Sequence, residues 1–315
     1  MSLFRPYDSY LLAVIALVEC ARRLPFLPLP DLFARILGTL AFTISRTKRA
    51  EIKSNLAHAL HQSSTPTQEK LVPELFTLFW QELLAWSLPD AHFVAGTTVV
   101  GVEHLQDALA RGKGVILWES NSFGNRVAAQ AILHAQGFGL TPIHAFRHLG
   151  GLDAGEPRDS QVFYKIIHPY FNKLERRRVA DILYLPQDGS LSFTRTLAER
   201  LAANAILCVA ADGVRGHKHI SLEFLGQTHN FATGMLSLAQ LTGAPLLPIF
   251  CTPQEKGGYL LEILPPLPLS PASSRAQQTD TLTAYVRLLE KRILAHPEWY
   301  RHWDLLAPNR VPSGS

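Results

Sequence analysis

The sequence has few cysteines and few charged residues. Only three of its 315 residues are cysteines, and they lie far apart, at Cys20, Cys208 and Cys251. This spacing fits neither a disulfide framework nor a zinc site, and it is typical of a protein from a reducing compartment. Charged residues make up 18% of the chain, below the average of about a quarter. The composition therefore predicts a globular protein that keeps part of its surface apolar.

The sequence also lacks a long apolar run. The longest candidate, residues 11–18, stops at Glu19, whereas a membrane-spanning helix needs about 20 apolar residues. Arg22 and Arg23 follow this run, while a signal peptide carries its positive charge before the run. We therefore expect residues 1–45 to form two helices that lie on a bilayer, or that pack on the main domain.

Apolar and basic residues are abundant instead. The chain is 47% hydrophobic with a formal net charge of +4, and its first 60 residues contain eight Lys and Arg against four Asp and Glu. Such a combination favours an anionic membrane surface or an acidic carrier protein as the partner. Because no basic module with interleaved aromatic residues is present, we expect no nucleic-acid binding.

The hydrophobic pattern changes near residue 95. Before it we expect only helices, including 46–61 and 68–88, with Asp31 as the N-cap of a helix. After it, strands alternate with helices, which predicts an α/β fold with a mostly parallel central sheet flanked by helices. We divide the chain into a membrane-associating helical region (1–95), an α/β domain (96–306) and a flexible tail (307–315). The expected strands are 99–102, 115–118, 140–145, 181–185, 205–210, 245–250 and 259–263, and the expected helices of the domain are 104–111, 126–136, 160–177, 192–203, 234–242 and 277–295.

Parallel sheets place their chemistry in loops beyond the carboxyl ends of the strands. Two such segments stand out: Glu-Ser-Asn-Ser-Phe-Gly-Asn-Arg at 119–126 and Asp-Gly-Val-Arg-Gly at 212–216. A further segment, Thr-Gly-Ala-Pro at 242–245, connects an expected helix to the following strand. Together and in this order they resemble the lipid A late acyltransferases of the lysophospholipid acyltransferase superfamily. The resemblance covers nearly the whole chain and includes His-Pro-Glu-Trp at 296–299.

The resemblance implies a His-x-x-x-x-Asp/Glu motif in the first loop, where the His removes a proton from the acceptor and the acid orients the His. This sequence departs from that motif. Ser122, or Asn121 if the loop has gained a residue, stands at the His position, Arg126 replaces a Trp, and Val127 replaces the acid. Glu119 is the nearest carboxylate and a possible substitute base. The catalytic candidates are therefore Glu119, Asn121 and Ser122.

The resemblance also implies binding residues. Arg215 corresponds to the Arg that binds the acceptor phosphate, with Asp212 orienting it and Gly213 allowing close approach of the backbone. Arg147 corresponds to an Arg that contacts phosphate or sugar. The substrate-binding candidates are Phe123, Gly124, Arg147, Asp212, Gly213 and Arg215.

We therefore expect transfer of a fatty acyl group from an acyl carrier protein or CoA thioester to a hydroxyl or amine. The resemblance places this reaction at the cytoplasmic face of a bacterial inner membrane and requires no cofactor beyond the thioester co-substrate. One alternative is a non-catalytic member that binds lipid or acyl groups, and another is an esterase or thioesterase that uses Ser122. The basic cluster 173–178 is a solvated face, or a docking site for an acidic acyl carrier or for lipid headgroups. We expect no metal site. His144 and His148 lie four apart at a strand end, where they do not share a face, and His217, His219 and His229 have no carboxylate or Cys at ligand spacing.

Overall fold

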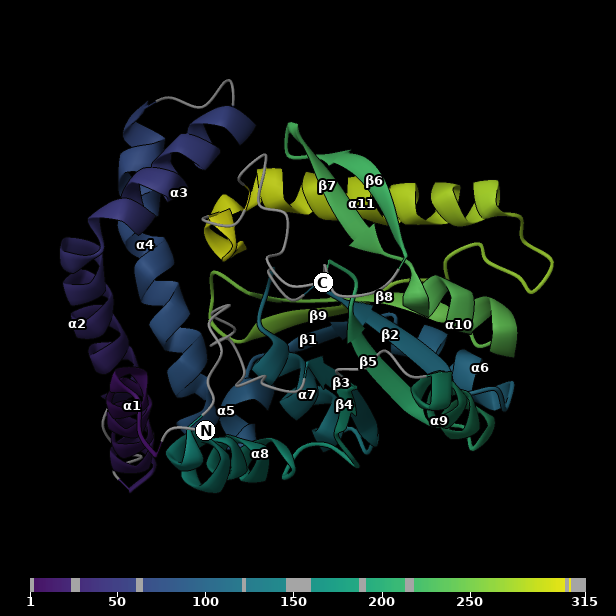
Figure 1. Ribbon diagram of the computed structural model, residues 1–315, viewed down its shortest axis with the longest axis horizontal. Helices are drawn as coiled ribbons and strands as arrows, with labels where there is room; N and C mark the ends of the chain where they lie inside the picture. Colours follow the sequence, from purple (N-terminus) through teal and green to yellow (C-terminus); the bar gives the residue numbers. More distant parts are fainter. Residues whose placement is uncertain are drawn as a thin grey trace.

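The computed structural model describes residues 3–23, 29–60, 65–120, 123–145, 160–186, 191–212, 218–303 and 306. Its centre is a seven-stranded sheet with the order β1-β9-β8-β2-β5-β3-β4 (Figure 1). The strands are β1 (Thr98–Val100), β2 (Val115–Glu119), β3 (Leu140–Ala145), β4 (Leu183–Leu185), β5 (Ile206–Ala210), β8 (Leu246–Pro253) and β9 (Tyr259–Ile263).

The sheet is mostly parallel, as the alternating pattern predicts. Strands β2, β3, β4, β5 and β8 run in one direction, whereas β9 pairs antiparallel with β8 and parallel with β1. The five-residue loop between β8 and β9 is too short for a crossover helix, so β9 has to return antiparallel. Every residue of β2 is buried, as expected for a central strand covered on both faces.

Helices cover both faces of the sheet, and alternate residues of β2 show the two layers. Val115 and Leu117 belong to one hydrophobic core, whereas Ile116 and Trp118 belong to the other. The first core also includes residues of α1 (Pro6–Arg23), α5 (Asp90–Val94), α6 (Val102–Ala110), α7 (Arg126–Ala135) and α8 (His168–Glu175). The second includes residues of α3 (Arg46–Ala59), α9 (Leu191–Ala202), α10 (Gly234–Thr242) and α11 (Arg275–Ala295). The fold class predicted from the sequence is confirmed.

The N-terminal region is helical, and α4 (Thr65–Leu84) contributes residues to both cores. Helix α2 (Leu29–Ile44) packs along α4 at the edge of the molecule (Figure 1). The two helices approach closely at Gly38, where an added Cβ would lie 2.7 Å from the Cα of Thr77. In the described part of the chain, no helix is long and apolar enough to cross a membrane.

Some local expectations are wrong. Asp31 lies in the first turn of α2 instead of capping it, because α2 begins two residues earlier. The predicted helix 160–177 is divided into a π-helical turn, η2 (Phe163–Ile167), followed by α8. The pattern also did not predict the antiparallel hairpin of β6 (His219–Phe224) and β7 (Gln227–Ala232), which lies beside α11 in Figure 1. Short 3-10 turns, η1 (Ala85–Ser87) and η3 (Pro297–Trp299), complete the described elements.

Candidate active site

The candidate active site lies at the carboxyl ends of β2, β5 and β3, which are neighbours in the sheet. Glu119 ends β2, Asp212 follows the end of β5, and His144 is the penultimate residue of β3. Parallel strands present their carboxyl ends at one edge of the sheet. The sheet therefore brings together polar residues from three distant parts of the chain.

The turn from β2 into α7 explains why the Phe-Gly-Asn sequence is present. Phe123 is buried in the second core. Gly124 has a φ of +82°, and a Cβ there would lie 2.5 Å from the carbonyl oxygen of Cys251, so only glycine fits. The Asn125 side chain accepts a hydrogen bond of 2.9 Å from the backbone N–H of Ala128 and caps α7. These three residues therefore set the geometry of the turn.

A buried ion pair between Arg301 and Glu82 also holds this turn. Arg301 Nη1 donates a hydrogen bond of 2.6 Å to the carbonyl oxygen of Gly124 and lies 2.7 Å from Glu82 Oε2 on α4. Both charged side chains are less than a tenth exposed, and burial raises the pKa of the Glu82 carboxyl. The C-terminal segment and α4 thereby fix the position of the turn.

Arg126, the first residue of α7, connects β2 to β3. Its Nε donates to Glu119 Oε1 at 3.0 Å, and its Nη2 lies 3.2 Å from His144 Nδ1. The side chains of Arg126 and Glu119 are only 12% and 10% exposed. Because a guanidinium can only donate, Nδ1 of His144 is the acceptor, and the ring proton is assigned to Nε2.

That assignment directs the His144 N–H at Glu175 of α8. His144 Nε2 lies 2.8 and 2.9 Å from the two oxygens of Glu175, and Gln130 Nε2 donates to Oε1 at 3.0 Å. Burial opposes the charge of Glu175, but His144, Arg126 and Gln130 outweigh it and lower the pKa of this carboxyl to about 2. Glu175 therefore carries a negative charge at neutral pH.

Glu119 behaves in the opposite way. Burial raises the pKa of its carboxyl, and this effect outweighs the attraction of Arg126. The positive charge of Arg126 balances the negative charge of Glu175. Of the two carboxyls, Glu119 is the one that takes up a proton more readily. A carboxyl with a raised pKa is suited to general acid–base catalysis near neutral pH.

The predicted segments 119–126 and 212–216 also meet, through Ser120 and Asp212. Ser120, directly after β2, donates from Oγ to Asp212 Oδ2 at 2.7 Å, and the same Oγ accepts from the backbone N–H of Phe123 at 3.0 Å. The 92 residues between Ser120 and Asp212 make this contact invisible in the sequence. Asp212 therefore lies at the edge that holds Glu119, as the resemblance implies.

Tyr285 of α11 adds a polar group close by. Its ring packs against Trp118 of β2, with the centroids 4.5 Å apart. The side chain is fully buried, and its hydroxyl has no hydrogen-bond partner within the described chain. Burial raises the pKa of Tyr285, with a smaller contribution from the charges of Asp212 and Glu119. Tyr285 consequently holds an unused donor on the second face of the sheet.

Several predicted site residues lie outside the described residues: Asn121, Ser122, Arg147, Gly213 and Arg215. Of the remaining candidates, Glu119 and Asp212 lie at the same edge, and Phe123 and Gly124 form the turn between β2 and α7. Val127, at the acid position of the motif, is buried in the first core. The roles of these residues in catalysis and binding stay predictions.

The residues that surround Glu119 were not predicted from the sequence. Arg126 was visible only as a departure from the motif, and Glu175, Glu82 and Arg301 were assigned no role. The available signal was Glu82, a charged residue within an apolar stretch of α4. Such a residue is rarely buried unless it is paired. Within the described ranges, no three His, Cys, Asp or Glu side chains cluster as a metal site would require.

Comparison with known proteins identifies the family of the chain. The sequence profile of the family described as "Bacterial lipid A biosynthesis acyltransferase" matches residues 5–147 and 162–304. Lipid A biosynthesis lauroyltransferase of Escherichia coli is 24% identical over 298 residues, which cover 88% of this chain and 85% of that protein.

Two further relatives are named for a different lipid. Phosphatidylinositol mannoside acyltransferase of Mycolicibacterium smegmatis is 24% identical over 269 residues, covering 83% of this chain and 79% of that protein. The enzyme of the same name from Mycobacterium tuberculosis is 24% identical over 264 residues, covering 82% and 76%. Because the family profile matches most of the length of this chain, the chain belongs to the bacterial lipid A biosynthesis acyltransferase family.

Proposed function

We propose that this protein transfers a fatty acyl group from an acyl carrier protein or CoA thioester to a hydroxyl or amine of a lipid acceptor. The family membership supports acyl transfer. The relatives named for lipid A and for phosphatidylinositol mannoside support a lipid acceptor. The observation that carries the proposal is the buried Glu119, whose pKa is raised at the edge where the family places its base.

In the proposed step, the acceptor O–H or N–H attacks the carbonyl carbon of the thioester. A C–O or C–N bond forms, the C–S bond breaks, and the sulfur leaves as the thiol. Glu119 accepts the proton of the acceptor and returns it to the departing sulfur. An amine acceptor makes the smaller demand on the base, because a free amine is already nucleophilic.

Around this step, Arg126 and the pair of His144 with Glu175 act as positioning residues for Glu119. Their contacts of 2.8–3.2 Å keep the carboxyl in one place and set its charge. We assign binding of the acceptor phosphate to Arg215 with Asp212 and Gly213, and a second phosphate or sugar contact to Arg147. Phe123 and Gly124 are assigned to substrate binding, and Asn121 and Ser122 stay catalytic candidates.

The test is thiol release from acyl carrier and CoA thioesters, measured with a thiol reagent while the acylated product is identified by mass spectrometry. We expect release that depends on an alcohol or amine lipid and that Glu119→Gln reduces by a factor of about 100 or more. Glu223→Gln, on the exposed face of the hairpin, is the control and should act like the wild type. Failure of thiol release with hydroxyl and amine lipids alike would contradict the proposal.

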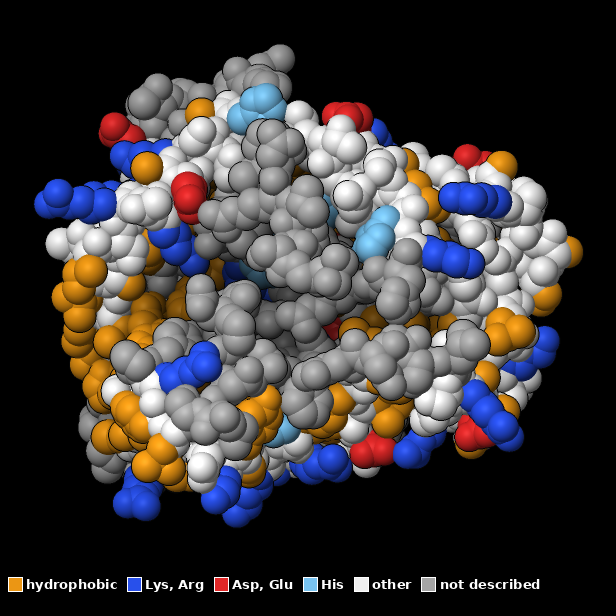
Figure 2. Space-filling model, viewed as in Figure 1, with side chains coloured by type: hydrophobic (Ala, Val, Ile, Leu, Met, Phe, Trp, Pro, Cys, Tyr) orange, Lys and Arg blue, Asp and Glu red, His pale blue; other side chains and the backbone are white. Residues whose placement is uncertain are grey.

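We place the reaction at the cytoplasmic face of the bacterial inner membrane, with α2 as the contact. Four large apolar side chains project from α2 at intervals of four residues and are 49–69% exposed: Leu32, Ile36, Leu40 and Ile44. Hydrophobic side chains gather along the left edge of the molecule, over α2 (Figure 2). Exposed Arg46 and Lys48 follow the stripe. An apolar helix face with adjoining basic residues suits an anionic lipid surface.

Sedimentation with vesicles tests this placement. The wild type should sediment with vesicles of phosphatidylglycerol and phosphatidylethanolamine, and less with phosphatidylcholine alone. Ile36→Asp with Leu40→Asp should remove most of that binding. The control is Leu241→Asp, because Leu241 is 70% exposed but stands alone on α10. Equal binding by the α2 variant and the control would refute the assignment of α2.

A second candidate function is a non-catalytic protein that binds lipid or acyl groups. The observation that favours it is Val127, which is buried where the motif requires an acid. Stoichiometric binding of an acyl thioester without thiol release would favour this reading. The esterase alternative predicts labelling by a serine-directed phosphonate that Ser122→Ala abolishes.

A further inference from the structure

The outer face of α8 and the preceding η2 turn is strongly basic. Four cationic side chains are exposed there: Lys165, Lys173, Arg176 and Arg177. The nearby acid, Asp181, is occupied by Arg176 and by Arg200 of α9. Lys173 and Arg177 form no ion pair within the described chain. This face therefore carries positive charge that the protein itself does not neutralise.

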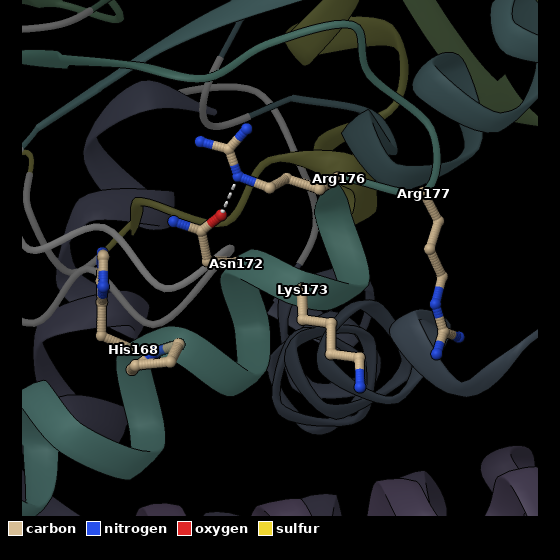
Figure 3. Close-up of a pocket in the computed structure, with 6 residues that line it drawn as sticks. His168, Asn172, Lys173, Arg176 and Arg177 are labelled. Carbon is tan, nitrogen blue, oxygen red and sulfur yellow. Dashed lines mark hydrogen bonds between the residues drawn. The ribbon is translucent and has the colours of Figure 1, made fainter.

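The shape of this face suits an extended partner. A shallow cavity of about 480 Å³ is lined by six residues: His168, Pro169, Asn172, Lys173, Arg176 and Arg177. Arg176 turns toward Asn172, to which its Nε donates at 2.8 Å, whereas Lys173 and Arg177 point away from that pair (Figure 3). Because the cations diverge, they do not converge on a single phosphate. They match several negative charges spread over a protein surface.

The same helix reaches the candidate active site on its inner side. Glu175 of α8 pairs with His144, and Asn172 donates to the Tyr184 hydroxyl at 2.6 Å. The Tyr184 ring lies between the cavity and the site, with its centroid 5.4 Å from that of His168 and 6.3 Å from that of His144. One helix thus connects the basic face to the buried network.

The helix is also held rigidly at its C-terminal end. Arg178 is buried and donates to Asp90 Oδ1 at 2.6 Å and to the carbonyl oxygen of Leu88 at 2.7 Å. Arg178 therefore belongs to the fold, while its neighbour Arg177 faces solvent. A rigid surface loses little conformational entropy when a partner docks.

We propose that the α8 face, with Lys173 and Arg177 at its centre, docks the acidic acyl carrier protein that delivers the thioester. This inference rests on the proposed acyl transfer and adds the place where the donor binds. A lipid surface is the less suitable partner. From Phe163 to Arg177, which covers η2 and α8, Ile166 is the one large hydrophobic side chain that is exposed, whereas α2 presents four.

The test measures binding and turnover separately. Labelled holo-acyl carrier protein is titrated with the full-length protein at low ionic strength and followed by fluorescence anisotropy. The docking variant is Lys173→Glu with Arg177→Glu. The control is Lys256→Glu with Lys291→Glu, which reverses two exposed charges on other elements and changes the net charge equally. Lys173→Gln with Arg177→Gln removes the charges without adding acids to the last turn of α8, and thermal unfolding checks each variant.

We expect the docking variant to bind the carrier at least about tenfold more weakly than the control does, and wild-type binding to weaken as salt is added. Thiol release should fall with acyl carrier thioesters but not with acyl-CoA, which has no protein surface. Equal carrier affinities of the docking and control variants would overturn the proposal, as would absence of wild-type binding. The proposal would also be overturned if the docking variant lost its binding to anionic vesicles and kept its binding to the carrier, because α8 would then face lipid.

The inference and the proposed function fail separately. Carrier binding that depends on α8 without thiol release would sustain the docking surface and refute acyl transfer. If the docking variant releases thiol from both donors as fast as the wild type does, acyl transfer is sustained and the docking surface is refuted.

Discussion

Glu175 gives the buried charge network a quantitative signature in the stability of the protein. Its contacts lower the pKa of the carboxyl from 4.5 to about 2. At about 1.4 kcal/mol per pH unit, this difference corresponds to roughly 3 kcal/mol of unfolding free energy. The folded pKa lies below the unfolded one, so the folded protein binds fewer protons. The stability is therefore complete above pH 4.5 and is lost as the pH falls toward 2.

Glu175→Gln is the perturbation that isolates this term. The amide oxygen can still accept the His144 N–H, but the negative charge that balances Arg126 is removed. We expect the free energy of unfolding at pH 7 to fall by roughly 3 kcal/mol. The difference from the wild type should shrink as the pH falls from 4.5 and vanish near pH 2. Urea unfolding followed by circular dichroism at a series of pH values measures it.

The matched control is Glu199→Gln. Glu199 forms an ion pair with Arg195 on α9, but the two side chains are 64% and 83% exposed. An exposed pair contributes less than about 1 kcal/mol. Parallel pH curves for Glu175→Gln and the wild type, with one constant offset, would refute the reasoning. The lost stability would then come from packing and not from the charge of Glu175.

Three further predictions concern the same region. Arg126→Leu should destabilise by about 3 kcal/mol at pH 7, because the buried charge of Glu175 loses its counterion, and adding Glu175→Gln should recover most of the loss in a double-mutant cycle followed by urea unfolding. Gly124→Ala should cost about 3 kcal/mol, because it combines a positive φ with a clash at the Cys251 carbonyl, and a melting temperature equal to the wild type would contradict this. Tyr285→Phe should leave the free energy of unfolding unchanged or raise it by about 1 kcal/mol, since the hydroxyl is buried without a partner, and a loss in urea unfolding would reveal a missed hydrogen bond.

Much of the fold was predictable because it depends on local patterns. The strand 140–145 and the helix 234–242 agree with β3 and α10 at both ends. A fully apolar run such as Val115–Trp118 indicates a buried strand of a parallel sheet whatever its neighbours are. The hairpin β6–β7 was not predicted, although β6 alternates polar and apolar residues as a half-buried strand does. Its partner β7 gives a weaker signal, because its apolar residues are confined to its end, at Phe231 and Ala232.

The site was less predictable, since its contacts join distant residues. Asn125 is recognisable as a helix cap from its position alone. The pairing of Glu175 with His144 spans 31 residues, and the Arg301 contact with Gly124 spans 177. No periodicity records which charge will neutralise which, because that depends on how α8 and the C-terminal segment pack against the sheet.

The sequence by itself determined the family and the α/β class, because the order of the motifs and the alternation of strands with helices are written along the chain. Only the tertiary structure decided that Arg126 contacts Glu119 and that Glu175 carries the negative charge of the network. Only it separated the buried Arg178 from the exposed Arg177. The physical reason is that burial and Coulomb attraction act through space, and they turn a departure from a motif into a balanced network.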